Sequence, residues 1–247
     1  MFSKSLIVAG MGIAVALAQN PVSAQEAPVK VGYTHKKGDV VKLRMTINAS
    51  VGGMDIVVKI TNKDEVTEVK DNGNVVTVQT PEATIVNIGG MDMEQPGGAK
   101  VTATRDKYGK LVELKAPEEA GAFMSPEVQK FQASITDILM PEKPVKAGDS
   151  WTTELDNPMV KGKKFSVKTT FVGIEKLEGK EYWKVKQTAT ADSDAAGAKT
   201  TVEFTAMLEP ATGTMFSAEG TVKDLPTLQA GAISWKMKVE QVKAAAK

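Results

Sequence analysis

The stretch Ser125-Pro-Glu-Val-Gln-Lys-Phe-Gln-Ala-Ser-Ile-Thr-Asp-Ile-Leu-Met-Pro141 separates two series of alternating β segments. Ser125 can cap the free amides of a first helical turn, and Pro126 suits the first helical position. Pro141 blocks continuation, because proline disfavours helical geometry in the residue before it. Apolar residues between them recur at the spacing of one helical stripe: Val128, Phe131, Ile135, Ile138 and Leu139. The pattern predicts an amphipathic helix, either packed on a sheet or forming a lid over an apolar cavity.

The segments on both sides of this helix have the period-two alternation of strands with one solvated face. Residues 41–51 alternate apolar and polar over eleven positions. After the helix, the Gly-Asp turn signal of residues 38–39 recurs at residues 148–149. Strands are predicted around residues 41–51, 56–61, 75–80, 84–88, 101–105 and 111–114, and then 151–155, 164–174, 182–191, 201–208, 214–222 and 234–242. Between them, residues 89–98 are predicted to form a glycine-rich loop.

The predicted fold is mainly β, with tandem-duplicated antiparallel β-meanders and one central amphipathic helix. The meanders can form a curved sheet, a sandwich or a barrel-like sheet, as one sheet or two. A flexible N-terminal segment is expected at residues 25–37, followed by a single β-rich domain over residues 38–247. Within that domain, repeats at 38–116 and 148–243 are joined by the helix and a proline-rich connector, 117–147.

The N-terminus has the features of a secretory signal peptide over residues 1–24. Lys4 supplies a positive charge, an apolar run extends from Leu6 to Ala18, and Val22-Ser23-Ala24 resembles a cleavage site. This run is shorter than the about 20 residues of a membrane span. We expect a soluble bacterial protein exported to the periplasm or the medium, with no integral membrane segment after cleavage. The absence of cysteine means that packing, and not disulfides, stabilises it.

The charge balance argues against a nucleic-acid partner. Removing residues 1–24 takes away only Lys4, so 30 basic and 30 acidic residues remain, interspersed along the chain. Such a pattern gives no positive surface for a phosphate backbone.

The inventory of reactive residues predicts a non-enzyme with no cofactor, no catalytic residue and no metal site. His35 is the only histidine, and there is no cysteine and no Gly-x-Ser-x-Gly motif. Zinc and copper sites built on histidine and cysteine therefore lack ligands. His35 itself is interpreted as an ordinary surface side chain.

Two groups of carboxylate residues could belong to functional sites, but each can also be interpreted as an ordinary solvated turn or loop. Asp192, Asp194, Gly197 and Glu203 fall on positions 1, 3, 6 and 12 of an EF-type calcium loop, but Ala196 at position 5 cannot ligate through its side chain. Asp92 and Glu94 could be the carboxylate pair of a glycosidase. A solvated turn and a solvated loop are the favoured interpretations.

The large apolar residues leave the ligand-binding residues unknown. Trp151, Trp183 and Trp235 could form a ligand platform, but each has the apolar phase of a strand, which favours core packing. Five methionines fall in predicted loops or at helix ends, where they either fill gaps, as favoured, or form an adaptable apolar surface. They are Met91, Met93, Met124, Met140 and Met159.

The connector Pro141-x-x-Pro144-Val145-x-x-Gly148-Asp149-x-Trp151, preceded by the helix, resembles a group of uncharacterised exported bacterial β-rich proteins. The resemblance implies export and a two-copy β architecture, and it implies no activity. A looser, fold-level likeness is to periplasmic lipoprotein carriers, in which a curved sheet wraps helices and binds acyl chains.

Two functions follow from these features. The first is a non-enzymatic binding protein that holds an apolar small molecule or an envelope protein. The alternative is a structural or assembly module of the cell envelope with no small-molecule ligand. An apolar cavity favours the first, and a filled core with an exposed sheet edge or patch favours the second.

Overall fold

The computed structural model describes residues 27–51, 53–117, 125–193, 197–227 and 231–242. Over these residues the chain forms one antiparallel sheet and one helix, α1 (Pro126–Thr136). The predicted fold class is confirmed. The strands are β1 (Val40–Val51), β2 (Met54–Val69), β3 (Val75–Ile88), β4 (Met91–Pro96), β5 (Val101–Arg105), β6 (Leu111–Lys115), β7 (Ser150–Asp156), β8 (Lys164–Leu177), β9 (Lys180–Asp192), β10 (Lys199–Leu208), β11 (Met215–Thr227) and β12 (Gly231–Gln241). The predicted signal peptide lies outside the described residues.

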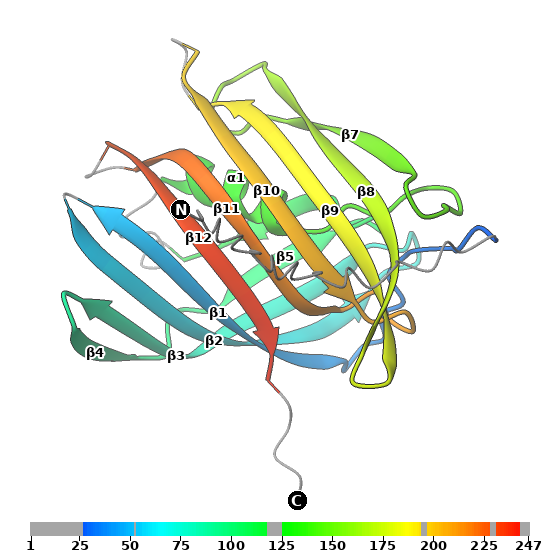
Figure 1. The fold of residues 1–247 in the computed structure, drawn as a ribbon, viewed down its shortest axis with the longest axis horizontal. Coiled ribbons are helices and arrows are strands. Elements are labelled where there is room, and N and C mark those ends of the chain that lie inside the picture. Colours follow the sequence, from blue (N-terminus) through cyan, green and yellow to red (C-terminus); the bar gives the residue numbers. More distant parts are fainter. Residues whose placement is uncertain (1–26, 52, 118–124, 194–196, 228–230, 243–247) are drawn as a thin grey trace, which may run out of the picture.

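The two halves of the chain belong to one open sheet of 12 strands. Its order is β6-β5-β3-β2-β1-β12-β11-β10-β9-β8-β7, with β4 paired to β3. The halves meet where β1 pairs with β12, which are the first and last strands. The sheet curves so that α1 lies between its two halves (Figure 1). The question of one sheet or two is thereby answered, because the closing strand β12 lies beside the opening strand β1.

The pairing of β1 with β12 defines the inner face of the sheet. Met45 lies opposite Val239, and Ile47 lies opposite Met237. Directly opposed residues of an antiparallel pair share one face. Since Val239 and Met237 are buried in the core beside α1, Met45 and Ile47 also point to the inner, helix-bearing face.

Helix α1 begins as the sequence predicts. The Ser125 hydroxyl accepts the amide hydrogen of Val128 at 3.3 Å, and Pro126 occupies the first turn. The apolar stripe is buried, with Phe131 and Ile135 fully inaccessible. The helix therefore packs as part of the core.

The helix ends earlier than its apolar stripe. Asp137 already has extended backbone geometry, although the following residues Ile138 and Leu139 are still buried. The cause is Gln187 of β9, whose side-chain amide donates to the carbonyls of Ile135 (3.1 Å) and Asp137 (2.8 Å). The last carbonyls of a helix lack partners within the helix. Here a side chain of the sheet replaces those partners and stops the helix.

The same Gln187 side chain accepts two hydrogen bonds through its oxygen. They come from the Leu139 amide at 3.1 Å and the Thr169 hydroxyl at 3.0 Å. An amide side chain offers two donor hydrogens and two acceptor lone pairs. All four positions are used, which explains how a glutamine with 1% exposure is accommodated in the core.

The two halves of the sheet are buried unequally. The buried residues of the core cluster come from α1, the connector, β7–β12 and Val31. Partly buried residues of β1 pack against this cluster. Among the described residues, β2–β6 contribute nothing to this cluster. Phe171 and Val185 are inaccessible in the C-terminal half, whereas Val58 of β2 is only half-buried. The helix thus covers the second half of the sheet and leaves much of the first half accessible.

The two halves open with the same turn. In Lys36–Asp39 and in Lys146–Asp149, the aspartate carboxylate accepts the amide hydrogen of the lysine, at 2.7 and 2.8 Å. Gly38 and Gly148 have φ of +90° and +91°, a geometry that favours glycine. The recurring Gly-Asp pair of the sequence therefore forms the same type of turn at the start of both halves.

The segment predicted to be flexible, residues 25–37, is packed over part of its length. Val29 and Val145 exchange backbone hydrogen bonds of 2.8 Å in both directions, and Val31 is 2% exposed. The prediction of a flexible segment is wrong there, because apolar side chains at alternate positions reach the core.

The glycine-rich loop predicted for residues 89–98 is also partly a strand. Residues 91–96 form β4, in which Met93 lies opposite Val86 of β3. A turn at Gly89 and Gly90, both with positive φ, reverses the chain and sets this pairing.

No helix in the described ranges has the length and apolar character needed to cross a membrane.

Candidate functional site

The N-terminal half of the sheet carries an apolar surface on its inner face. Val58 lies opposite Ile47 on one side and Val86 on the other, so the face defined by β1 continues across β2 and β3. We call this surface the inner apolar face. Its half-buried members are Met45, Ile47, Ile56, Val58, Ile60, Val86 and Ile88.

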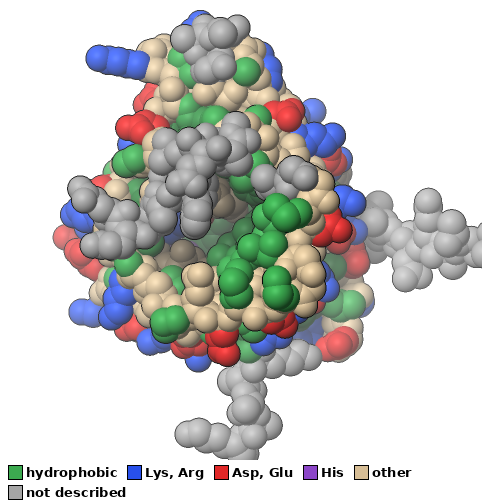
Figure 2. All heavy atoms as spheres, turned by 90° about the vertical axis from the view of Figure 1, so that its left-hand side faces the viewer, with side chains coloured by type: hydrophobic (Ala, Val, Ile, Leu, Met, Phe, Trp, Pro, Cys, Tyr) green, Lys and Arg blue, Asp and Glu red, His purple; other side chains and the backbone are tan. Residues whose placement is uncertain are grey.

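Three exposed methionines extend the inner apolar face at the hairpin ends of β1–β4. Met54, Met91 and Met93 are 56%, 73% and 46% exposed, and their partners in the sheet place Met91 and Met93 on the inner face. Figure 2 looks at the side of the molecule where these hairpins lie and shows a hollow with hydrophobic side chains gathered along one side. Unbranched methionine side chains adapt to irregular apolar partners. Met91 and Met93 therefore fit the adaptable surface, which was the less favoured interpretation.

The other methionines fill gaps, as the sequence favoured. Met140 is 3% exposed, and Met159 packs against the core cluster. Met124 lies outside the described residues. Trp183 and Trp235 are core residues as well, each 7% exposed, and Trp151 is half-buried against the core cluster.

A cavity of about 390 Å³ lies at the opposite end of β1–β3, between the end of α1 and residues 33–41. We call it the polar cavity. Leu43, Val66 and Val75 form apolar parts of its wall. Its polar side chains come from seven separate segments, so only the tertiary fold brings them together.

One wall of the polar cavity is an ion pair between β5 and the residue that follows α1. The Arg105 Nε donates to Asp137 Oδ2 at 2.7 Å, and its Nη1 donates to the Thr77 hydroxyl at 2.9 Å. The two side chains are 26% and 16% exposed. Burial raises the pKa of Asp137, and the Arg105 charge opposes this rise. The pair fixes the first half of the sheet to the end of the helix.

Tyr33 and His35 form a second wall. The Tyr33 hydroxyl donates to the Ile138 carbonyl at 2.7 Å, and burial raises the pKa of this phenol. His35 stacks on Tyr33 with ring centroids 5.1 Å apart, and burial lowers its pKa. A Cβ at Gly109 would lie 2.7 Å from both the Tyr33 ring and the Ile138 oxygen, so glycine is needed there. His35 is thus a half-buried wall residue and not the ordinary surface histidine that was predicted.

Two acceptor oxygens on β2 have no partner within the described structure. They are Asn62 Oδ1 and Asp64 Oδ1, both buried. Asn62 is 8% exposed, and Asp64 lines the polar cavity. Burial raises the pKa of Asp64, while hydrogen bonding to Gln79 lowers it to a smaller extent. A buried polar atom without a partner costs stability, so the Asp64 oxygen in the cavity wall marks a place where a donor is missing.

Asp64→Asn is expected to make the protein more stable at pH 7 and to flatten its stability–pH curve. The folded state binds the Asp64 proton more tightly than the unfolded chain does, because burial raises this pKa above its ordinary 3.8. Stability then falls as pH rises from about 4 through the raised pKa, since the unfolded state binds fewer protons. Urea unfolding from pH 4 to pH 8 measures the effect.

Asp55→Asn provides the control on the same strand, because Asp55 is exposed. Its stability–pH curve should run parallel to that of the wild type. Parallel curves for Asp64→Asn as well would show that burial of this carboxylate has no energetic consequence.

The residues of the possible calcium loop are engaged in ion pairs. Asp192 pairs with Lys199, and Glu203 pairs with Lys186 at 2.5 Å. Asp194 lies outside the described residues. Within the described part of the chain, no three histidine, cysteine, aspartate or glutamate side chains are grouped to hold a metal ion. The lysines lower the pKa of both paired carboxyls.

Asp92 and Glu94 are both exposed on β4. The Asp92 carboxylate accepts a hydrogen bond of 2.6 Å from the Asn87 amide. The two side chains therefore stand in solvent on an outer strand of the sheet.

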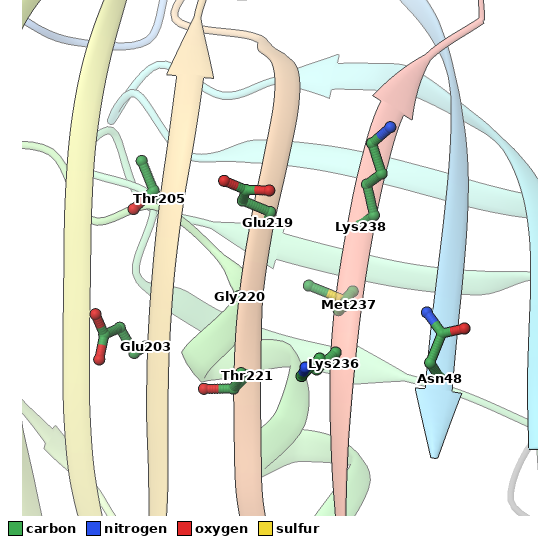
Figure 3. A pocket seen from close by; sticks show the side chains of 9 residues that line it. All are labelled: Asn48, Glu203, Thr205, Glu219, Gly220, Thr221, Lys236, Met237 and Lys238. Carbon is green, nitrogen blue, oxygen red and sulfur yellow. The ribbon is translucent and has the colours of Figure 1, made fainter. Parts of the chain in front are cut away.

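A further hollow of about 530 Å³ lies across β10, β11, β12 and β1 (Figure 3). Its walls carry charges of both signs, with Glu219 opposite Lys238 and Glu203 on the neighbouring strand. Met237 is the only large apolar residue among its lining residues, and its side chain is buried in the core on the other face. Because its side chains are mostly charged or polar, this surface favours contact with water over binding of an apolar ligand.

Comparison with known proteins gives a likeness of fold. No family model and no curated protein matches the chain. The chain is similar to lipovitellin, from a structure on lipid–protein interactions in that protein, with a TM-score of 0.50 and 11% identity. The match covers 87% of this chain and 26% of that one, so the chain spans about a quarter of lipovitellin's length. A putative outer membrane lipoprotein-sorting protein domain from Vibrio parahaemolyticus matches with a TM-score of 0.21 and 8% identity over 83% of each chain.

Proposed function

We propose that this protein is an exported, non-enzymatic carrier that holds an apolar ligand against the inner apolar face of β1–β4. The observation that carries the proposal is the unequal burial of the two sheet halves. The C-terminal half is covered by α1, whereas the residues of the inner apolar face on β1–β3 remain half-buried, and Met54, Met91 and Met93 are exposed.

The physical reason is the free energy of apolar surface in water. Burying it gains about 25 cal/mol per Å². Contiguous apolar surface that a protein leaves accessible commonly marks a binding site. An alkyl or acyl chain lying on Ile56, Val58 and Ile60 would bury their accessible surface, much as α1 buries Phe171 and Val185 on the other half.

The likeness to lipovitellin supports this proposal at the level of the fold. The matched parts of the two chains share a fold, and that structure concerns lipid–protein interactions. The non-enzymatic part of the proposal rests on the inventory of one histidine and no cysteine. Export rests on residues 1–24, and sequencing the N-terminus of protein secreted by a bacterial host tests it.

Val58→Lys is expected to weaken binding of a fluorescent fatty acid by at least about tenfold. A lysine on this face would place an ammonium group where the alkyl chain lies, and its desolvation has no compensating partner. Fluorescence titration of the full chain with a fluorescent fatty acid measures the dissociation constant, and a thermal melt confirms that the variant folds.

Val57→Lys is the matched control. Val57 is also half-buried on β2, but it lies opposite Asn48 and Asn87 and points to the other face. Its affinity should equal that of the wild type. Equal losses of affinity in the two variants would contradict binding of the alkyl chain on the inner apolar face.

One observation favours the alternative assembly module. Strand β7 is an end of the sheet, and its outer edge borders a hollow of about 700 Å³ together with the connector and residues 106–110. An accessible strand edge can pair with another chain. Sedimentation of the full chain at increasing concentration tests this function, since a monomer at all concentrations would exclude self-assembly through β7.

A further inference from the structure

We infer that the polar cavity receives the primary ammonium group of a single-chain amphiphile, which donates a hydrogen bond to Asp64. This inference rests on the proposed function, because the alkyl chain of that amphiphile would lie on the inner apolar face. It names the class of ligand that the carrier holds.

The charges around the cavity favour a cation. Five acidic side chains line it, against one basic side chain, Arg105. Burial lowers the pKa of His35, which favours its neutral form. The five acidic residues are Asp39, Asp64, Asp106, Asp137 and Glu209.

Most of these acidic groups already have partners. Asp39 accepts the Lys36 amide at 2.7 Å, and Asp106 accepts two amides of its own turn at 2.9 Å. Asp137 pairs with Arg105. Asp64 differs from them, because one of its oxygens is buried without a partner. A cation entering the cavity would therefore meet the carboxylates of Asp64 and Glu209, and of these two only Asp64 has an oxygen buried without a partner.

The unpartnered Asp64 oxygen makes the site specific for a donor. The second unpartnered oxygen, on Asn62, is two residues away and on the same face of the strand, but Asn62 does not line the cavity. An ammonium group has three donor hydrogens and no acceptor. It can satisfy the Asp64 oxygen, whereas a carboxylate cannot.

An anionic head group has little to bind in this cavity. The Arg105 Nε and Nη1 hydrogens are used by Asp137 and Thr77. A carboxylate would approach five acidic side chains and compete with Asp137 for the one guanidinium. The arrangement therefore discriminates against fatty acids relative to amines with the same chain.

The position of Asp64 connects the head-group site with the inner apolar face. Beyond Asn62, the same face of β2 continues with Ile60, Val58 and Ile56. A strand rises about 3.3 Å per residue, so the distance from Asp64 to Ile56 is about 26 Å. A long alkyl chain can extend along these residues with its head group at Asp64.

Isothermal titration of the full chain with decylamine, decanol and decanoate at pH 7, each below its micellar concentration, tests the inference. We expect decylamine to bind at least about tenfold more tightly than decanol, and decanoate to bind most weakly. A hydrogen bond to a charged group contributes about 1.5–3 kcal/mol, which corresponds to about 10- to 100-fold in affinity.

Asp64→Asn should remove the preference for decylamine over decanol and leave decanol affinity unchanged. The exposed Asp55→Asn variant should keep the wild-type preference, which excludes a general effect of net charge. Equal binding of the three compounds by the wild type would overturn the head-group inference while leaving the carrier function supported. Binding of none of them would overturn both.

Discussion

Replacing Phe131 with alanine is expected to lower the free energy of unfolding by about 3–5 kcal/mol, the usual cost of deleting a buried aromatic side chain. Phe131 is fully inaccessible on α1, and its ring packs on Phe165 of β8 with centroids 5.3 Å apart. A typical domain is stable by about 5–15 kcal/mol, so the loss would be a large share of the total. Equilibrium unfolding in urea measures it.

Phe216→Ala is the matched control, because Phe216 is half-buried and stacks on Tyr182 at 4.3 Å. Its loss should be clearly smaller. The Phe131→Ala variant should also keep its affinity for a fluorescent fatty acid wherever it is folded, since α1 covers the C-terminal half of the sheet. A small loss of stability together with weakened ligand retention would instead mean that α1 is a movable lid.

Gln187→Met is expected to cost about 3–5 kcal/mol, although the new side chain has a similar shape. The change removes all four hydrogen bonds of the amide and leaves the Ile135 and Asp137 carbonyls and the Leu139 amide without partners. Each buried group left unsatisfied costs about 1–3 kcal/mol of stability. Because the surrounding structure relaxes in part, the total loss is expected to be smaller than the sum of the largest single costs. The same unfolding experiment measures this loss.

Gln95→Met makes the same chemical change at an exposed position of β4 and should leave stability within about 0.5 kcal/mol of the wild type. If Gln187→Met were equally mild, the end of α1 would not depend on β9. The boundary at Asp137 would then have to follow from the local sequence alone.

Local features of the sequence were sufficient for most elements of the fold, and β4 was an exception. Ser125 and Pro126 start the helix because capping depends on residues within one turn. Period-two alternation revealed most strands, since adjacent side chains of a strand always point to opposite faces. The Gly-Asp pairs at 38–39 and 148–149 marked equivalent turns, because their φ requirement is also local.

The candidate site could be predicted only in part. An apolar ligand was expected, and a surface suited to it is present, but none of its residues was singled out except Met91 and Met93. The polar cavity was missed completely. Its walls come from Tyr33, Asp64, Arg105 and Asp137, which are far apart in sequence and carry no motif. The one weak signal was polar Asn62 and Asp64 on the apolar phase of β2.

The sequence by itself thus determined most of the element types, the helix start and the burial of its stripe, because each depends on neighbours within a few residues. Tertiary structure decided that β1 pairs with β12, that Gln187 stops α1 and that the helix covers one sheet half and leaves the other accessible. Both repeats have alternating apolar residues, so periodicity predicts an inner face for each. Which face receives the helix depends on contacts between residues about 50 positions apart, and that choice creates the accessible surface on β1–β4.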